Sequence, residues 1–276
     1  MKIAVVGAGI VGSSVAYRLS QRGAEVVLID GAEPGSGTTS ASFAWVNANN
    51  KLPRDYFELN VAGMREHEWL RDEIGGDWLH PTGNLIWAAE EEQENLERRV
   101  ERLHAWSYAA EMLPASTVYE KLEPGAVIPD PRVAHFPEES WVDAPALTRT
   151  LVQAASRNGA TTLIGDAVHG IEVGGEGVTL RLENSDAVHA DAMVNATGAR
   201  AASMAKMVGR ELPLDVFRGC SSGLPSQVNL CAASCTRHRS TFDQTVTASS
   251  YCTTTPLTNG SRTTSPGRKT RSAESS

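Results

Sequence analysis

Residues 2–30 read KIAVVGAGIVGSSVAYRLSQRGAEVVLID, and this stretch decides the fold of the chain. The apolar run at 2–6 ends at Gly7, which is typical of a buried parallel strand that enters a tight turn. Residues 11–22 place apolar side chains on one helical face, and residues 25–30 form a second apolar run. A strand, a helix and a strand within about thirty residues require parallel strands and a right-handed crossover. The pattern therefore predicts an α/β fold.

The turn after the first strand carries the motif G-x-G-x-x-G, written here as Gly7-Ala8-Gly9-Ile10-Val11-Gly12. Gly7 allows the tight turn, Gly9 lets a pyrophosphate approach the backbone, and Gly12 lets the helix pack closely on the strand. The helix N-terminus adds free N–H groups and a partial positive charge. Asp30 ends the second strand, where an acid accepts hydrogen bonds from an adenosine ribose. The combination predicts dinucleotide binding rather than a plain glycine-rich turn with a surface acid, although the motif alone does not separate NAD from FAD.

The rest of the chain up to Phe217 alternates between predicted helices and strands. Amphipathic spacing predicts helices over 55–74, 90–110 and 144–157. Two apolar stripes are expected to be buried: Tyr56, Leu59, Met64, His67 and Leu70 on the first helix, and Leu96, Val100 and Leu103 on the second. Apolar runs predict strands over 85–88, 161–164 and 192–196, and a hairpin over 168–173 and 178–182. Residues 38–48 are small and polar, which favours a loop with a helical turn lying against a ligand.

The composition excludes several classes of protein. With 276 residues, of which 41% are hydrophobic and 21% charged, the chain has room for one large or two modest globular domains and is not fibrous. Its formal charge of −8 supplies no positive field for nucleic acid or an anionic membrane, so a small-molecule partner is expected. The sequence shows neither a signal peptide nor an apolar run of membrane-spanning length. We therefore expect a cytoplasmic protein without a transmembrane segment.

Residues 218–276 differ sharply from the rest of the chain. They hold 23 Ser and Thr, seven Lys and Arg and only two acids, which gives this tail a charge of +5 against −13 for residues 1–217. No apolar period persists in the tail, which predicts disorder. All four cysteines lie there, and a disulfide framework or a zinc site at Cys231, Cys235 and His238 are the alternatives to incidental thiols. The loose spacing favours incidental thiols and predicts no metal site.

Two further segments narrow the choice of cofactor. Residues 34–45, PGSGTTSASFAW, and residues 194–198, VNATG, resemble the D-amino-acid oxidase/glycine oxidase family of FAD-dependent oxidoreductases, often called DadA-like. The resemblance runs from Met1 to about Phe217, with supporting pieces at 51–59, 82–85, 142–145 and 159–168. An NAD-dependent dehydrogenase is the disfavoured alternative, because the loop at 38–45 and the second turn at Thr197 and Gly198 have no role in it.

The resemblance implies FAD as the cofactor and assigns its contacts residue by residue. Ile10 and Val11 would lie at the pyrophosphate beside the three glycines, and Asp30 at the adenosine ribose. The other implied contacts are Thr38 and Thr39 with the phosphates, Phe43, Ala44 and Trp45 along the approach to the isoalloxazine ring, Val168 at the adenine edge, and Thr197 and Gly198 in a turn that closes over the dinucleotide. The alternatives are a polar loop for Thr38 and Thr39, strand core for Val168 and a core aromatic for Trp45.

By the same resemblance, the parent activity is oxidation of the C–N bond of a small amino acid: a D-amino acid, glycine or an N-methylated amino acid. A hydride passes to flavin N5, the imine hydrolyses to an oxo acid, and the electrons leave to oxygen or a quinone. Such a site needs an arginine that holds the substrate carboxylate. The sequence offers no candidate for this arginine outside the tail and assigns no catalytic residue.

The resemblance also predicts the domains. We expect a Rossmann-like FAD-binding domain from residues 1–80 and 145–217, an incomplete α+β substrate segment at 81–144, and the tail at 218–276. The family ordinarily continues for well over a hundred residues beyond the region of Pro213 and Leu214. The abrupt change of composition after Phe217 suggests a truncated gene or a shifted reading frame. A catalytically inactive fragment that at most binds FAD is therefore the alternative to an active enzyme.

Overall fold

The computed structural model describes residues 1–126, 128, 132–215 and 234–238. Its central element is a sheet, sheet A, with the strand order β13-β1-β2-β9. These strands are β1 (Lys2–Val6), β2 (Glu25–Asp30), β9 (Thr161–Ile164) and β13 (Ala192–Asn195). All three pairings are parallel, and Val5 faces both Leu28 and Val194 in register. The predicted α/β fold with a parallel sheet is confirmed.

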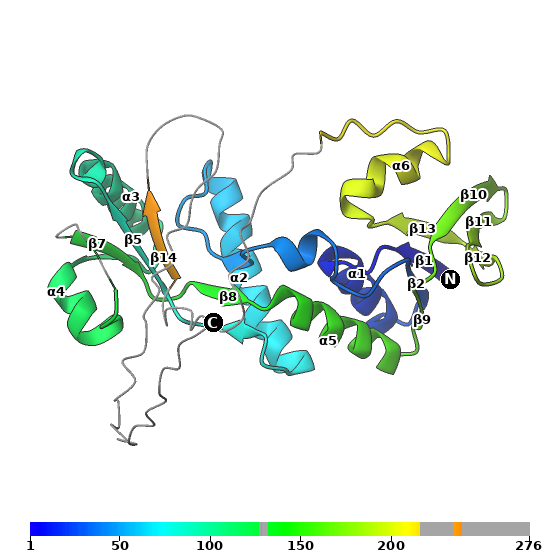
Figure 1. Cartoon of the computed structure of the whole chain (residues 1–276), viewed down its shortest axis with the longest axis horizontal. Helices are drawn as coiled ribbons and strands as arrows, with labels where there is room; N and C mark the ends of the chain where they lie inside the picture. The colour runs from blue at the N-terminus through cyan, green and yellow to red at the C-terminus, as the bar shows by residue number, and fades with distance from the viewer. Residues whose placement is uncertain (127, 129–131, 216–233, 239–276) are drawn as a thin grey trace, which may run out of the picture.

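Two helices cover one face of sheet A (Figure 1). They are α1 (Ile10–Gln21) and α5 (Ala144–Arg157), and both match their predicted ranges closely. Val5 and Leu28 point from the sheet into a core that includes Leu147 and Leu151 of α5. The carboxylate of Asp143 caps α5 by accepting the N–H of Ala146 at 2.8 Å. This cap fixes where the helix begins.

The other face of sheet A packs on a small antiparallel sheet, sheet D. Its strands are β10 (Val168–Gly174), β11 (Gly177–Leu182) and β12 (Val188–Ala190). Val6 and Ile29, which alternate with the helix-facing residues, contact Ile171 and Leu180 of this sheet. Met204 of α6 (Ala201–Lys206) joins the same core, after the short η4 (Gly198–Arg200). The predicted hairpin is confirmed.

The other half of the molecule is built on sheet C, which lies at the far end from sheet D (Figure 1). Its order is β14-β5-β7-β6, with β5 (Asn84–Ala88), β6 (Glu111–Pro114), β7 (Arg132–Phe136) and β14 (Ser234–His238). On one face lies α3 (Gln93–Ala105), preceded by η2 (Glu90–Glu92), and its predicted stripe of Leu96, Val100 and Leu103 is buried. On the other face lie α4 (Ala115–Thr117) and η3 (Val118–Leu122), where Val118 packs with Leu85 and Trp87.

Strand β14 comes from the tail. It pairs in parallel with β5, with Cys235 opposite Leu85 in the register. Where we expected no regular structure, the five residues of β14 form a strand, because β5 presents unpaired backbone groups on the side away from β7. The rest of the predicted tail lies outside the described residues, including Cys220, Cys231 and Cys252.

A fourth sheet, sheet B, connects the loop after β2 to the chain before α5. It contains β3 (Trp45–Val46), β4 (Leu79–His80) and β8 (Ser140–Val142), in the order β3-β8-β4. Trp141 stands opposite both Trp45 and His80, and the His80 ring stacks on it at 3.9 Å. The predicted helical turn in 38–48 is present as η1 (Thr38–Ala41).

Helix α2 (Arg54–Ile74) runs between the two halves and contributes to both cores (Figure 1). Phe57 is buried against Trp106, and Leu70 packs in the core beneath α5. The predicted buried stripe is wrong at Tyr56 and Leu59, which are exposed. Phe57, the residue after Tyr56, is buried instead, because the helix face that meets the sheet C core is offset by one residue from the face that the spacing indicated.

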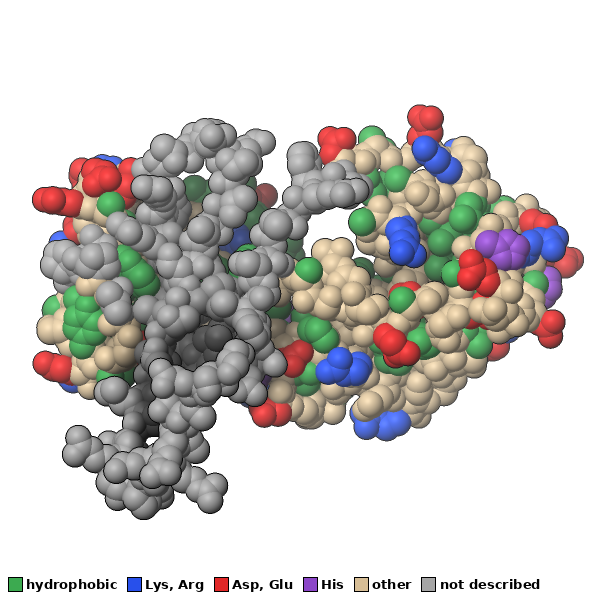
Figure 2. All heavy atoms as spheres, viewed as in Figure 1, with side chains coloured by type: hydrophobic (Ala, Val, Ile, Leu, Met, Phe, Trp, Pro, Cys, Tyr) green, Lys and Arg blue, Asp and Glu red, His purple; other side chains and the backbone are tan. Residues whose placement is uncertain are grey.

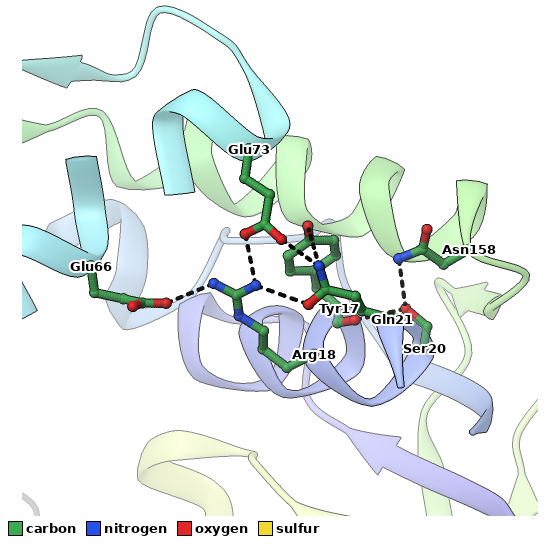
Figure 3. Close-up of polar contacts among 7 residues, drawn as sticks. All are labelled: Tyr17, Arg18, Ser20, Gln21, Glu66, Glu73 and Asn158. Carbon is green, nitrogen blue, oxygen red and sulfur yellow. Dashed lines mark hydrogen bonds and ion pairs between the residues drawn. The ribbon is translucent and has the colours of Figure 1, made fainter. Parts of the chain in front are cut away.

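An ion-pair cluster joins α2 to α1 (Figure 3). The guanidinium of Arg18 bonds Glu66 at 2.6 Å and Glu73 at 2.7 Å, both on α2. Gln21 also donates to Glu73. Burial alone would raise the pKa of Glu73, but the hydrogen bonds from Gln21, Arg18 and Tyr17 lower it below its ordinary value. The cluster therefore favours the ionised form of Glu73 and fixes α2 against α1.

The surface shows acidic and basic side chains interspersed on the visible face of the sheet A half (Figure 2). Within the described ranges, no helix has the length and apolar character needed to cross a membrane. The same ranges contain no group of three or more His, Cys, Asp or Glu residues placed to hold a metal ion.

Candidate functional site

The glycine turn between β1 and α1 leaves no room for side chains at two of its three glycines. Gly7 has a φ of +106°, and a Cβ there would lie 2.4 Å from the carbonyl oxygen of Ala196. A Cβ at Gly12 would lie 1.8 Å from the carbonyl oxygen of Gly7. Gly7 therefore allows the turn and its contact with the segment after β13, while Gly12 allows α1 to pack on the turn.

Gly9 is different, because a Cβ there would meet only the Thr39 hydroxyl, at 3.3 Å. Gly9 is also the N-cap of α1, and neither a capping side chain nor an acid occupies the first turn of this helix. The N–H of Ile10 donates to Thr39 Oγ1 at 3.2 Å, and Val11 is 65% exposed. The helix start is thus an open, electropositive backbone surface with the Thr39 hydroxyl beside it.

Asp30 is tied directly to the glycine turn. Its Oδ2 accepts the N–H of Ala8 at 2.6 Å, and its Oδ1 accepts the N–H of Ala32 at 2.9 Å. Each carboxylate oxygen keeps a further lone pair for a ligand hydroxyl. The loop that follows returns to the same place, because the N–H of Gly35 donates to the carbonyl of Ala8 at 2.9 Å. The glycine turn, Asp30 and the loop before η1 therefore form one hydrogen-bonded unit.

The second turn, after β13, closes this unit from the other side. Thr197 donates from its hydroxyl to Asn195 Oδ1 at 2.7 Å, and Asn195 donates from Nδ2 to the carbonyl of Ala201 at 2.9 Å. Gly198 follows with a φ of +55°. The contact between Gly7 and Ala196 brings the two turns together, and the side chain of Asn195 fixes the shape of the second.

Val168 and the loop residues 43–45 lie outside the two turns themselves. Val168 starts β10 directly after Gly165 and Asp166, whose N–H groups donate to the carbonyl of Asp30. Its side chain packs partly buried in the core between sheets A and D. The segment just before Val168 therefore lies against Asp30 in the fold, and the Val168 side chain contributes to the strand core as well.

Ala44 has a φ of +46°, in the left-handed region that residues with a Cβ rarely adopt. Its carbonyl accepts the N–H of Val142 at 3.0 Å, and its N–H donates to Ser42 Oγ at 3.0 Å. Phe43 is 57% exposed, whereas Trp45 is half-buried against the sheet C core. Sheet B thus holds a strained loop between the two halves, and strained backbone is common at ligand sites.

A buried polar cluster next to this loop went unnoticed in the sequence. Glu139 is fully buried and accepts hydrogen bonds from Tyr108 Oη at 2.7 Å, from Asn49 Nδ2 at 2.8 and 2.9 Å, and from Trp45 Nε1 at 3.1 Å. Burial raises the pKa of Glu139 to about 7, although the hydrogen bonds from Tyr108 and Asn49 act in the opposite direction. Since its partners lie 31 to 94 residues away, no local pattern could have revealed the cluster.

The strand, the open glycine turn, the acid at the end of β2 and the second turn define a dinucleotide-binding α/β protein. A family model described as FAD dependent oxidoreductase matches residues 2–263, and the chain belongs to this family. The match decides between the two dinucleotides in favour of FAD.

Individual relatives support this assignment. The chain is 29% identical over 215 residues to the uncharacterized oxidoreductase YurR of Bacillus subtilis, covering 74% of this chain and 57% of YurR. It is 28% identical over 217 residues to a glycine oxidase of Bacillus licheniformis, covering 74% and 56% respectively. The crystal structure of glycine oxidase from Geobacillus kaustophilus superposes with a TM-score of 0.68 and 26% identity, over 75% of this chain and 58% of that one. The chain thus spans little more than half the length of these relatives.

The residues of this chain fit FAD. The uncapped start of α1 and the bare backbone at Gly9 suit a pyrophosphate, because nothing but the Thr39 hydroxyl approaches that surface among the described residues. Asp30 is half-buried and keeps acceptor capacity for a ribose hydroxyl. Thr197, Gly198 and Asn195 shape the opposite side.

Proposed function

We propose that this chain binds FAD between its two turns and belongs to an oxidoreductase that oxidises the C–N bond of a small amino acid, such as glycine, an N-methylated amino acid or a D-amino acid. The observation that carries the proposal is the contact between the glycine turn and the Ala196 turn, with the open start of α1 between them. The names of the relatives, glycine oxidase among them, support the substrate class. Oxygen or a quinone would take the electrons.

In this proposal the role of the protein is to bind FAD and to orient the substrate. Bound FAD would supply the hydride acceptor at its isoalloxazine ring. Gly9 and Val11 offer backbone N–H groups to the pyrophosphate, and Ile10 lies beside them with its N–H donating to Thr39 Oγ1. Thr38 and Thr39 add hydroxyl groups. Asp30 accepts from the ribose hydroxyls. The backbone around Val168 binds the adenine, and the hydrogen bonds from Gly165 and Asp166 to the carbonyl of Asp30 hold this segment beside the ribose-binding acid.

The loop at Phe43, Ala44 and Trp45 lines the approach to the isoalloxazine ring. The N–H of Val142 donates to the carbonyl of Ala44, and Trp45 Nε1 donates to Glu139, and these hydrogen bonds hold the loop in place. Thr197 and Gly198 close over the dinucleotide. The roles of these loop and turn residues are part of the same proposal.

A second candidate function is FAD binding without turnover. The chain covers 57% of YurR and 56% of the licheniformis glycine oxidase. The similarity therefore does not by itself imply that this chain carries a complete substrate site. Anaerobic bleaching of bound flavin by a panel of amino acids separates the two: an active enzyme bleaches with at least one amino acid, and a binding-only chain with none.

The first test is the visible absorbance spectrum of the purified, desalted chain, together with a titration by FAD. We expect an oxidised-flavin spectrum at near one flavin per chain. Gly9→Ala should fold normally but weaken FAD binding by about tenfold or more, or roughly 1.4 kcal/mol, because its methyl group occupies the pyrophosphate surface. Gly63→Ala, in α2 with open space at its Cβ, is the matched control and should bind FAD as the wild type does. A colourless chain that takes up no FAD contradicts the proposal.

A further inference from the structure

The cluster around Glu139 joins three segments that are distant in the sequence: residues 45–49, Tyr108 and Glu139 itself. Trp45 lies in β3, Asn49 in the loop that follows, and Tyr108 after α3. Tyr108 Oη donates to Glu139 and also accepts the N–H of Ala48 at 3.2 Å. Through these bonds the carboxylate holds both ends of the segment 45–49, which directly follows the strained residue Ala44.

Every side chain that bonds the carboxylate of Glu139 does so as a donor. An ionised carboxylate is acceptor-only and suits all of them, whereas a protonated one brings an O–H among donors and loses acceptor capacity. Burial favours the neutral acid, whereas the surrounding hydrogen-bond donors favour the ionised carboxylate. The hydrogen bonds to the segment 45–49 are therefore strongest when Glu139 is ionised.

The charged and titratable groups that face Glu139 come from several elements. Tyr108 lies against it, and burial raises the pKa of this phenol well above its ordinary value, with the charge of Glu139 next in effect. Burial lowers the pKa of Arg99 of α3, and the charge of Arg102 lowers it further, while the charge of Glu139 acts to raise it. Glu138, in the same turn, is exposed. None of these groups takes the place of Glu139 as the acceptor for Trp45 and Asn49.

We propose that Glu139 is a positioning residue for the isoalloxazine-facing loop: its carboxylate fixes the segment 44–49 through Trp45, Asn49 and Tyr108, and it links FAD affinity to the protonation of this one buried acid. This inference rests on the proposed function, because it takes the loop at Ala44 and Trp45 to face FAD. Loss of a proton tightens the segment and favours the bound cofactor. Uptake of a proton loosens the segment and weakens binding.

The first test measures the Kd of FAD between pH 5.5 and 8.5 by quenching of flavin fluorescence. In the wild type the Kd should rise as the pH falls through about 7, by up to about tenfold per pH unit, the limit for one proton. Glu139→Gln should show a weak Kd that is the same at every pH. Glu138→Gln removes the neighbouring exposed acid and should keep the wild-type profile. A Glu139→Gln profile equal to that of the wild type overturns the inference.

The second test needs no cofactor. The indole N–H signal of Trp45, assigned by its loss in Trp45→Phe, is followed by ¹H–¹⁵N NMR as the pH changes. It should shift with a midpoint near 7 in the wild type and stay constant in Glu139→Gln. Total tryptophan fluorescence is unsuitable, because it sums the emission of Trp45 with that of the other tryptophans, such as Trp141, which stacks on His80. A Trp45 signal that does not titrate in the wild type overturns the inference.

Tyr108→Phe keeps the test decisive if Glu139→Gln fails to fold. Loss of the Tyr108 donor destabilises the ionised carboxylate of Glu139. The midpoint of the FAD Kd profile and that of the Trp45 signal should therefore both move to higher pH. Unchanged midpoints overturn the inference. If no variant binds FAD at any pH, the proposed function and the link to FAD both fail, whereas the Trp45 titration by itself decides whether Glu139 fixes the segment.

Discussion

Gly9 and Gly12 stand three residues apart in one motif, yet they are restricted to glycine for different physical reasons. At Gly12 the protein itself leaves no room for a side chain, since a Cβ there would overlap the carbonyl of Gly7. Gly9 has space within the protein, and in the proposed function the restriction there comes from FAD. In the proposed function, a single motif thus combines a folding requirement with a binding requirement.

Replacement by alanine should therefore affect FAD binding at Gly9 but the stability of the fold at Gly12. Gly12→Ala should destabilise the fold by about 3 kcal/mol, because α1 must move away from the glycine turn to make room. Thermal unfolding followed by circular dichroism measures the loss. Gly63→Ala serves again as the control, and should leave stability unchanged or raise it by up to about 1 kcal/mol, since alanine favours a helix more than glycine does. A Gly12→Ala chain as stable as the wild type would refute the packing argument.

At the scale of elements, the position of α2 depends on a few contacts with α1 and α5. The Arg18 cluster supplies the polar part of that contact, and Leu70 with Trp78 supplies the apolar part. Because α2 reaches from this core to the core of sheet C, the cluster affects the placement of both. The pairs are partly exposed, so their contribution is moderate.

Arg18→Met should lower the stability by about 1 kcal/mol at neutral pH. The lowered pKa of Glu73 means that its stabilising effect is present above the unfolded-state value near 4.5 and is lost as the pH falls through the folded-state value. The difference between the variant and the wild type should therefore shrink in acid. Arg98→Met, which breaks an exposed pair with Glu94, is the control and should change stability by less than about 0.5 kcal/mol. An Arg18→Met effect that is independent of pH between 3 and 7 would rule out this role for Glu73.

At the scale of the whole molecule, the exposed apolar side chains at the start of α2 stand out. Leu52, Tyr56 and Leu59 are 55%, 47% and 68% exposed, and Tyr56 and Leu59 lie one helical turn apart. Neighbouring apolar side chains on a surface promote association. They also lie near the segment 44–49 in the chain, at the boundary between the two halves.

We expect the chain to associate as its concentration rises, as measured by light scattering after size exclusion. Leu59→Lys should reduce this association, because a charge within the exposed group disfavours its burial against another chain. Val173→Lys changes an equally exposed apolar residue on the sheet D hairpin and should have little effect. A wild-type chain that stays monomeric at every concentration would contradict the expectation.

Much of the sheet A half could be predicted from local patterns. The run at 2–6, the glycine turn and the helix at 144–157 are short-range features, and hydrophobic periodicity with a cap or a stop residue is enough to define them. The two-residue strands β3 and β4 are too short to produce a period. The buried stripe of α2 was misjudged by one position because two different cores compete for that helix.

The order of residues along the chain was therefore sufficient for the parallel sheet, the dinucleotide motif and the resemblance to FAD-dependent oxidoreductases, because each depends on spacings of a few residues. Only the tertiary structure decided that Thr39 lies at the start of α1, that the Ala196 turn touches Gly7, and that Glu139 is buried among Trp45, Asn49 and Tyr108. In the sequence, Glu139 stands beside Glu138 in a turn that looks like solvent-exposed surface. Its environment is set by segments up to 94 residues away, which come together only in the folded chain.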